Sequence, residues 1–123
     1  MSTTHNTFSL RSVLEKDKLN GSNFLEWYRN LRIVLRQEKK DYVLEKVLSE
    51  KPKANAQHAE RNAWDKHSND RVDVSCLMLA TMNSDLQKQY ENVESPIEMI
   101  TSLKDMFQEQ ARTERYHTVK SLI

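Results

Sequence analysis

Glycine, proline and cysteine are scarce in this chain, which has one glycine, two prolines and one cysteine in 123 residues. Tight β-hairpins consume glycine because their turns need positive φ, so the scarcity favours helices joined by polar loops. A single glycine also excludes the phosphate-binding loop, the dinucleotide fingerprint and the nucleophile elbow, since each needs several glycines. The sequence therefore predicts an all-α protein without these catalytic motifs.

Metal-binding and catalytic groups are equally sparse. Cys76 has no partner for an internal disulfide, and the apolar run VSCLMLA around it predicts a buried core thiol in a reducing compartment. The histidines are scattered: His5, His58, His67 and His117. A zinc site needs about four clustered nitrogen or sulfur ligands, which these scattered residues do not supply. The candidates for acid–base catalysis are Asp65, Asp70 and Asp73, but they fall on a predicted helix, where carboxylates usually face water. We therefore expect no catalytic residue, metal, cofactor or small-molecule substrate, and no enzymatic activity.

No run of 18 apolar residues is present, and the N-terminal residues lack the basic start and apolar core of a signal peptide. We expect a cytoplasmic protein without a membrane partner. The hydrophobic fraction is 37% and the charged fraction 30%, which suits amphipathic helices with one wet face each. The net charge of +1 is unevenly spread, because residues 1–61 carry +4 and residues 62–123 carry −3. This split is either chance or a basis for head-to-tail contacts between copies.

The length fits one domain, which we expect to be a compact bundle of about five to seven helices over residues 9–123 after a flexible tail, residues 1–8. A short helix at 8–15, with Ser9 as its cap and Leu10, Val13 and Leu14 inward, precedes a turn at Asn20-Gly21, where glycine supplies positive φ. Further helices are predicted at residues 23–37, 42–48, 56–82, 85–90, from 96 and from 113.

The helix at 23–37 has the clearest pattern, because Asn23 and Glu26 have capping-box spacing. Apolar side chains recur at helical spacing: Phe24, Trp27, Tyr28, Leu31, Val34 and Leu35. Basic side chains fall on an adjoining face: Arg29, Arg32, Arg36, Lys39 and Lys40. Three interpretations of this basic stripe stay open, namely a solvated face, an RNA- or anion-binding face, and a contact with another protein.

The helix at 56–82 has a polar middle, HSNDRVD, that could bend it. Its expected inward positions are Ala59 or Ala63, Trp64, His67, Arg71 or Val72, Val74, Ser75, Met78 and Met82. Ser95-Pro96 and Glu98 then form a strong helix start. That helix is expected to turn inward Ile97, Ile100, Leu103, Met106 and Phe107. The last helix, with Tyr116, Val119 and Leu122 inward, has no stop signal before Ile123, so we expect the natural protein to continue.

Three blocks in this order resemble the Gag protein of plant copia-type LTR retrotransposons. The first block, KLNGSNFLEW, matches the family pattern K-L-x-G-x-N-[FY]-x-x-W at Lys18, Leu19, Gly21, Asn23, Phe24 and Trp27. The second resembles the family's long helix around Trp64, and the third, from Ser95, resembles its L-x-x-x-F helix around Phe107. The similarity covers roughly residues 9–123.

The resemblance implies a fold like the N-terminal lobe of a retroviral capsid. It also implies a structural role, in which copies of the chain assemble a virus-like particle around the element's RNA. Two alternatives stay open: a domesticated Gag domain that binds a protein or peptide, and an RNA-binding domain that does not assemble. By analogy with capsid lattices, Arg29, Arg32 and Arg36 would line a ring or face RNA. The family's Cys/His zinc knuckle needs several cysteines and is excluded here.

Overall fold

The computed structural model describes residues 10–122, and the side chains of residues 10–109. Its helices are α1 (Arg11–Lys16), α2 (Phe24–Gln37), the 3₁₀ turn η2 (Asp41–Leu44), α3 (His58–Ala80), α4 (Ser84–Tyr90) and α5 (Pro96–Leu122). No strand occurs in this range. The prediction of an all-α bundle with about five to seven helices is confirmed.

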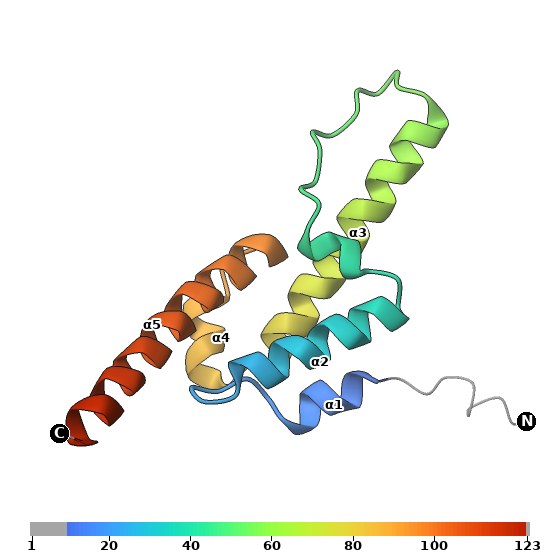
Figure 1. Ribbon diagram of the computed structural model, residues 1–123. Coiled ribbons are helices and arrows are strands. Elements are labelled where there is room, and N and C mark those ends of the chain that lie inside the picture. Colours follow the sequence, from blue (N-terminus) through green and yellow to red (C-terminus); the bar gives the residue numbers. More distant parts are fainter. Residues whose placement is uncertain (1–9, 123) are drawn as a thin grey trace, which may run out of the picture.

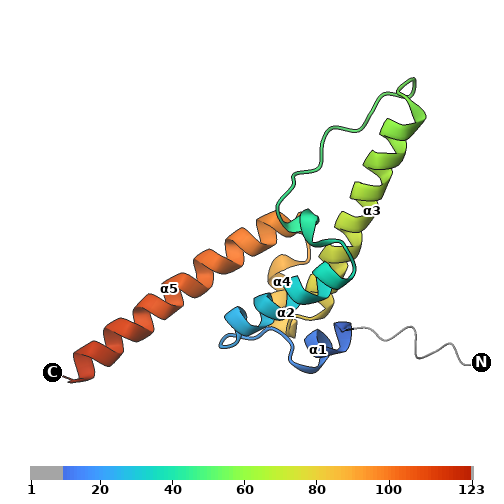
Figure 2. The ribbon, with the colours of Figure 1, turned by 45° about the vertical axis from the view of Figure 1, so that its right-hand side comes forward.

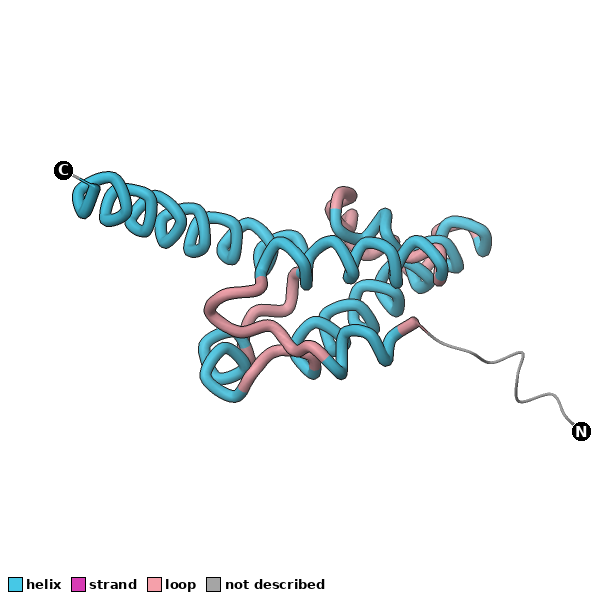
Figure 3. The backbone as a smooth tube through the Cα atoms, turned by 60° about the horizontal axis from the view of Figure 1, so that its bottom comes forward, coloured by secondary structure: helices cyan, strands magenta, loops and turns pink. Residues whose placement is uncertain are grey.

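The two long helices, α3 and α5, are staggered, so that the first half of α3 projects to the upper right and the second half of α5 to the lower left, and α2 packs where the two helices overlap (Figures 1 and 2). The short helix α1 packs on α2, and α4 packs on α3. The first half of α3 and the second half of α5 extend beyond this body, as the tube in Figure 3 shows for α5. The core therefore forms between α2, the second half of α3 and the first half of α5.

The predicted apolar stripe of α2 is the centre of this core. Its five fully inward residues are buried: Phe24, Trp27, Leu31, Val34 and Leu35. Opposite them lie buried residues of α3 and α5: Val74, Leu77, Met78, Met99, Ile100 and Leu103. Tyr28 is half-buried at the edge. The helical spacing thus places one continuous apolar stripe against two partner helices, which is the main stabilising term of the fold.

Helix α3 continues through its polar middle, because Asp70 and Asp73 are paired there with residues of other elements. Several of its inward predictions are wrong. Cys76 is exposed, and so are both Ala59 and Ala63; of the alternatives Arg71 and Val72, Arg71 is half-buried and Val72 is exposed. The apolar run of seven residues around Cys76 spans almost two turns, so it covers both faces of the helix. Val74, Leu77 and Met78 occupy the inward face and leave Cys76 on the other.

The first short helix is shorter than predicted. Helix α1 begins at Arg11, with Leu14 buried and Val13 39% exposed. Val13 was predicted to point inward, but a helix of six residues packs only one narrow side. The predicted tail, residues 1–8, and the predicted cap Ser9 lie outside the described residues.

The predicted helix at 42–48 is only the 3₁₀ turn η2, and Val47 beyond it is 75% exposed. One turn already places Val43 in the core, so no further buried surface supports a longer helix.

Helix α5 begins at Pro96, as its capping serine predicts, and α4 begins at Ser84, one residue before the prediction, with Asn83 as its cap. Asn83 Oδ1 accepts a hydrogen bond from the Leu86 amide at 3.0 Å, and Ser95 Oγ accepts one from the Glu98 amide at 3.3 Å. The prediction of a separate last helix from residue 113 is wrong, because α5 runs unbroken to Leu122. The residues around 108–112 are good helix formers without glycine or proline. The predicted inward side chains beyond residue 109 lie outside the described side chains, and Ile123 lies outside the described residues.

The left-handed backbone conformation occurs at Lys39 (φ 61°) and not at Gly21, whose φ is not positive. The end of α2 is a Schellman motif, in which the Lys40 amide donates to Leu35 O at 2.8 Å and the Lys39 amide to Arg36 O at 3.1 Å. This motif needs positive φ at the residue after the cap, so Lys39 adopts a conformation that glycine usually supplies.

Candidate interaction surface

The residues that carry the Gag resemblance form a structural joint between the α1–α2 loop and the α3–α4 junction. Leu19 is fully buried and pairs with Met82 as an isolated parallel bridge. The Leu19 amide donates to Thr81 O at 2.7 Å, and Leu19 O accepts from the Asn83 amide at 2.9 Å. The buried indole Nε1 of Trp27 donates to Thr81 Oγ1 at 3.2 Å. Leu19 and Trp27 of the KLNGSNFLEW block, which we call the signature block, therefore join the α1–α2 loop and α2 to the α3–α4 junction.

Asn23 occupies the N-cap position of α2, but its side chain makes no cap hydrogen bond there, contrary to the capping-box prediction, and serves this joint instead. Its Oδ1 accepts from the Asn20 amide at 2.8 Å, and its Nδ2 donates to Lys18 O at 3.0 Å. Asn20 Oδ1 in turn accepts from the Ser22 amide at 2.8 Å. These side-chain bonds to the backbone hold the turn, which explains why Gly21 needs no positive φ there.

The other two signature aromatics differ in environment. Phe107 of α5 is half-buried and stacks on Phe24 of α2, with ring centroids 5.1 Å apart and planes 7° apart. Trp64 was predicted in the core but is only half-buried, and its Nε1 donates to Ser49 O at 2.8 Å. The first half of α3 extends beyond the body, so the loop after η2 is what covers Trp64.

The outward side of α2 carries a mixed basic and apolar surface, which we name the arginine face. Its members lie within an arc of about 100° on a helix of 3.6 residues per turn: Leu25, Arg29, Arg32, Ile33 and Arg36. All five are exposed, Leu25 to 74% and Ile33 to 50%. The three arginines of the predicted basic stripe are therefore exposed, but sequence reasoning missed the two large apolar side chains beside them. Those two follow from the same helical spacing.

The arginine face is electrostatically uncompensated within residues 10–109. No ion pair joins Arg29, Arg32 or Arg36 to any carboxylate in that range. Lys39, just beyond the helix, is exposed and has no ion pair in that range either. Like charges at neighbouring helical positions destabilise a helix slightly, so this arrangement costs stability unless an anionic partner approaches.

Lys104 of α5 extends this positive surface. The half-buried Tyr28 ring has the Arg32 guanidinium 4.6 Å from its centroid and the Lys104 ammonium 5.1 Å from it. Tyr28 also stacks on Phe24, with centroids 5.6 Å apart. The π-electrons of the Tyr28 ring hold both cations beside the arginine face without neutralising them. Lys104 lies far from α2 in the sequence, so only the folded chain brings it here.

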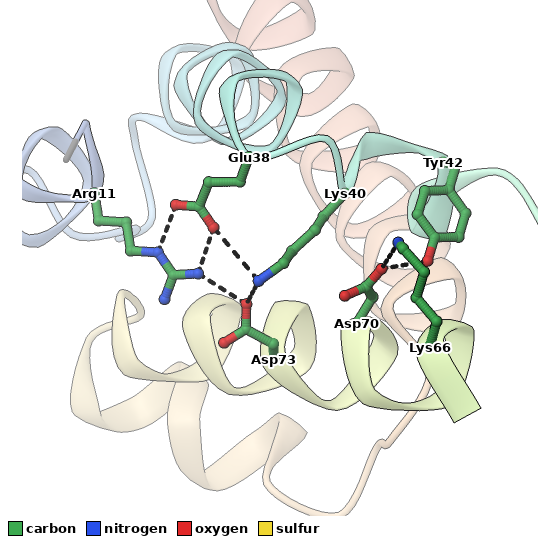
Figure 4. A network of polar contacts seen from close by, with 7 residues as sticks. All are labelled: Arg11, Glu38, Lys40, Tyr42, Lys66, Asp70 and Asp73. Atoms are coloured by element: carbon green, nitrogen blue, oxygen red, sulfur yellow. Dashed lines mark hydrogen bonds and ion pairs between the residues drawn. The ribbon is translucent and has the colours of Figure 1, made fainter. Parts of the chain in front are cut away.

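Lys40, the fifth member of the predicted basic stripe, belongs to a separate ionic network (Figure 4). Its ammonium lies 2.5 Å from Asp73 Oδ2 and 3.8 Å from Glu38 Oε1. Arg11 of α1 binds the same two carboxylates, donating from Nε to Glu38 Oε2 at 2.6 Å and from Nη2 to Asp73 Oδ2 at 2.8 Å. Two cations and two anions thus balance, and they join α1, the end of α2 and α3.

The network lowers the pKa of both carboxyls. The hydrogen bond from Arg11 lowers the pKa of Glu38, and its partial burial opposes this only in part. Burial raises the pKa of Asp73, but hydrogen bonds from Lys40 and Arg11 outweigh burial and lower it overall. Lys40 is therefore engaged in holding the fold together and is not free to bind a partner.

A second polar centre lies one turn away on α3. Asp70 accepts hydrogen bonds from the Tyr42 hydroxyl and from Lys66 Nζ, the latter at 2.8 Å (Figure 4). Burial together with the Asp70 contact raises the pKa of Tyr42. The ring of His67 is buried 5.1 Å from that of Tyr42, and its Nε2 has no hydrogen-bond partner among the described residues. The centre packs η2 against α3 and presents no free reactive group to solvent.

A hollow of about 300 Å³ lies between η2 with its following loop, α3 and the start of α5. It is lined by Val43, Lys46, Val47, Leu48, Arg71, Ser95, Pro96, Ile97 and Glu98. The lining is mainly apolar and includes three charged side chains, the basic Lys46 and Arg71 and the acidic Glu98. No cluster of three or more metal-ligating side chains occurs among the residues the structure describes.

Within the same part of the chain, no helix is long and apolar enough to cross a membrane. Comparisons of the chain with protein-family models, curated proteins and solved structures gave no match. The arginine face is thus the feature of the described surface that most clearly indicates a partner.

Proposed function

We propose that this chain is a structural assembly module, the N-terminal capsid region of a Gag protein of the copia type. In this role, copies of the chain associate through exposed helix faces and build a particle that encloses RNA. No catalytic group takes part. The module needs only a rigid helical body and several weak contact surfaces, since a shell closes through many repeated contacts.

The observation that carries the proposal is the arginine face. Three unpaired arginines lie on one exposed helix side together with Leu25 and Ile33. Large exposed apolar residues are individually common, but here they alternate with uncompensated charge on a helix anchored by a buried stripe. A surface of this kind is typical of a protein-protein contact in which apolar side chains supply area and charges supply orientation.

The signature block supports the resemblance on physical grounds. Leu19 and Trp27 are buried in the joint with the α3–α4 junction, and Asn23 holds the turn between them. Residues that determine the fold, as these do, are the ones that proteins of the same fold share even when their surfaces and functions differ.

The test is the mass of the full chain as a function of concentration. Sedimentation velocity and light scattering should show a weight-average mass that rises from the monomer as concentration increases toward about 1 mM, the range of weak interfaces. Electron microscopy of the concentrated sample should then show ordered particles or sheets. A chain that remains monomeric throughout, with or without added RNA, contradicts the proposal.

RNA binding without assembly is the second candidate function, favoured by the two cations over the Tyr28 ring. If Arg29, Arg32, Arg36, Lys39 and Lys104 all contacted phosphates, the logarithm of the affinity for single-stranded RNA would fall with log salt at a slope of about −3.5. A fluorescence-anisotropy titration at several salt concentrations measures this slope. Tight binding by a strictly monomeric chain would favour this candidate over assembly.

A further inference from the structure

The chain carries an acidic surface that complements the arginine face. Between residues 84 and 98, across α4 and the start of α5, four carboxylates and one lysine give a net charge of −3. We name the four carboxylates the acidic corner: Asp85, Glu91, Glu94 and Glu98. All four are exposed, and none forms an ion pair with another residue of the described chain. Positive and negative charge therefore occupy different surfaces of one molecule, and neither neutralises the other internally.

Apolar surface accompanies the acidic corner as it accompanies the arginine face. Glu98 also lines the hollow, together with the half-buried Ile97 and with Val47, which is 75% exposed. Lys46 and Arg71 line the hollow as well, so the charge of the hollow itself is mixed, and Glu98 is the member of the acidic corner that lines it. The arginine face thus combines positive charge with exposed apolar side chains, and the acidic corner meets an apolar hollow at Glu98.

We infer that the arginine face of one copy binds the acidic corner of a second copy, with Leu25 or Ile33 entering the neighbouring hollow. This inference rests on the proposed function and names the surfaces through which assembly occurs. Because the two surfaces differ, the contact is heterologous: each copy uses its arginine face toward one neighbour and its acidic corner toward another. Such contacts propagate into rings or open chains and do not stop at a dimer.

A protein partner fits the arginine face better than RNA does. Leu25 and Ile33 offer no hydrogen bond to phosphate and no aromatic surface for a base, whereas a mainly apolar hollow that ends at Glu98, with further exposed carboxylates in the preceding segment, offers contacts to both the apolar side chains and the arginines. The second copy is the occupant because this same chain carries that hollow and those carboxylates.

The experiment reverses charge on each surface in turn in the full chain. One variant carries Arg29→Glu and Arg36→Glu, which leaves the Tyr28–Arg32 contact intact. The other carries Glu91→Arg and Glu94→Arg, which avoids the first turns of α4 and α5, where acidic residues stabilise the helix start. Each variant alone should weaken self-association at least about tenfold in sedimentation velocity, because like charges then meet across the contact.

Mixing the two variants in equal amounts is the decisive measurement. In one kind of contact, the glutamates introduced on α2 of the first variant meet the arginines introduced at the acidic corner of the second variant. In the other kind, the native arginine face of the second variant meets the native acidic corner of the first. Association of the mixture should return to within about threefold of the native chain. The matched control is Lys53→Glu with Arg61→Glu, the same charge change at two exposed positions away from both surfaces. It should associate like the native chain, and circular dichroism verifies the fold of every variant.

Replacing Leu25 and Ile33 by serine tests the apolar part without any change in charge. Self-association should weaken at least about tenfold while the unfolding midpoint stays close to that of the native chain, because both side chains are exposed.

The outcomes separate this inference from the proposed function. If the native chain associates but the two charge variants associate equally well, or their mixture is not rescued, the inference is wrong and assembly uses other surfaces. If nuclease treatment abolishes association of the native chain, RNA bridges the copies and the inference is again wrong. If the native chain never associates, the proposed function itself fails.

Discussion

Replacing Lys39 by glycine should stabilise the protein, because Lys39 adopts the left-handed conformation at the end of α2 with φ of 61°. A residue with a β-carbon pays about 1–2 kcal/mol for this conformation. Glycine avoids that cost but loses about 0.5–1 kcal/mol through the greater freedom of its unfolded chain. The difference predicts a gain of about 0.5–1 kcal/mol in the free energy of unfolding. For a domain of this size, the melting temperature should rise by about 2–4 °C.

The matched control is Lys39→Ala, which removes the same exposed ammonium group and retains the β-carbon. Glycine should exceed alanine by about 1 kcal/mol in urea unfolding followed by circular dichroism. The two Schellman hydrogen bonds, from the Lys39 and Lys40 amides, are backbone bonds and persist in both variants. Equal stability of the two variants, or a less stable glycine variant, would refute the assignment of strain to this residue.

Three further predictions test the fold. Asp73→Asn removes the carboxylate that Arg11 and Lys40 share and should lower the free energy of unfolding by about 1 kcal/mol, measured by urea titration. The folded chain lowers the pKa of Asp73 and Glu38, so their contribution to the free energy of unfolding is complete at neutral pH. This contribution is lost as pH falls below the ordinary pKa values of the two groups, 3.8 for Asp73 and 4.5 for Glu38. Urea midpoints should therefore drop in that pH range, and they should drop less steeply in Asp73→Asn. Cys76 should react with a thiol reagent in the folded protein nearly as fast as in urea, and slow labelling would contradict its exposure.

Sequence reasoning predicted the local features of this fold well, because their causes lie within a few residues. The stripe from Phe24 to Leu35 needed only helical spacing, and the start of α5 at Pro96 needed only a capping serine and a proline. The arginine face follows from the same spacing, read on the opposite side of α2.

Features that depend on which segments meet in space could not be predicted. Cys76 lies in an apolar run that covers both faces of α3, so which face is buried depends on where the partner helices pack, and whether Trp64 is covered depends on how far those helices extend. Lys40 looked like part of the basic surface until the fold brought Asp73 beside it, and Lys104 looked unrelated until the fold brought it to Tyr28. Contacts between residues far apart in the sequence thus remove Lys40 from the basic surface of α2 and add Lys104 to it.

The backbone bridge between Leu19 and Met82 has a consequence for how this chain folds during synthesis. The two residues are about 60 positions apart, so closing the loop between them costs conformational entropy that only the completed core repays. Until the ribosome has added Met82 and Asn83, Leu19 and the indole of Trp27 have no partners, and the newly made α2 exposes its apolar stripe. Translation pauses before the first half of α5 has emerged should therefore leave the nascent chain open to aggregation and to chaperones, because Met99, Ile100 and Leu103 complete the cover of this stripe, whereas later pauses should not.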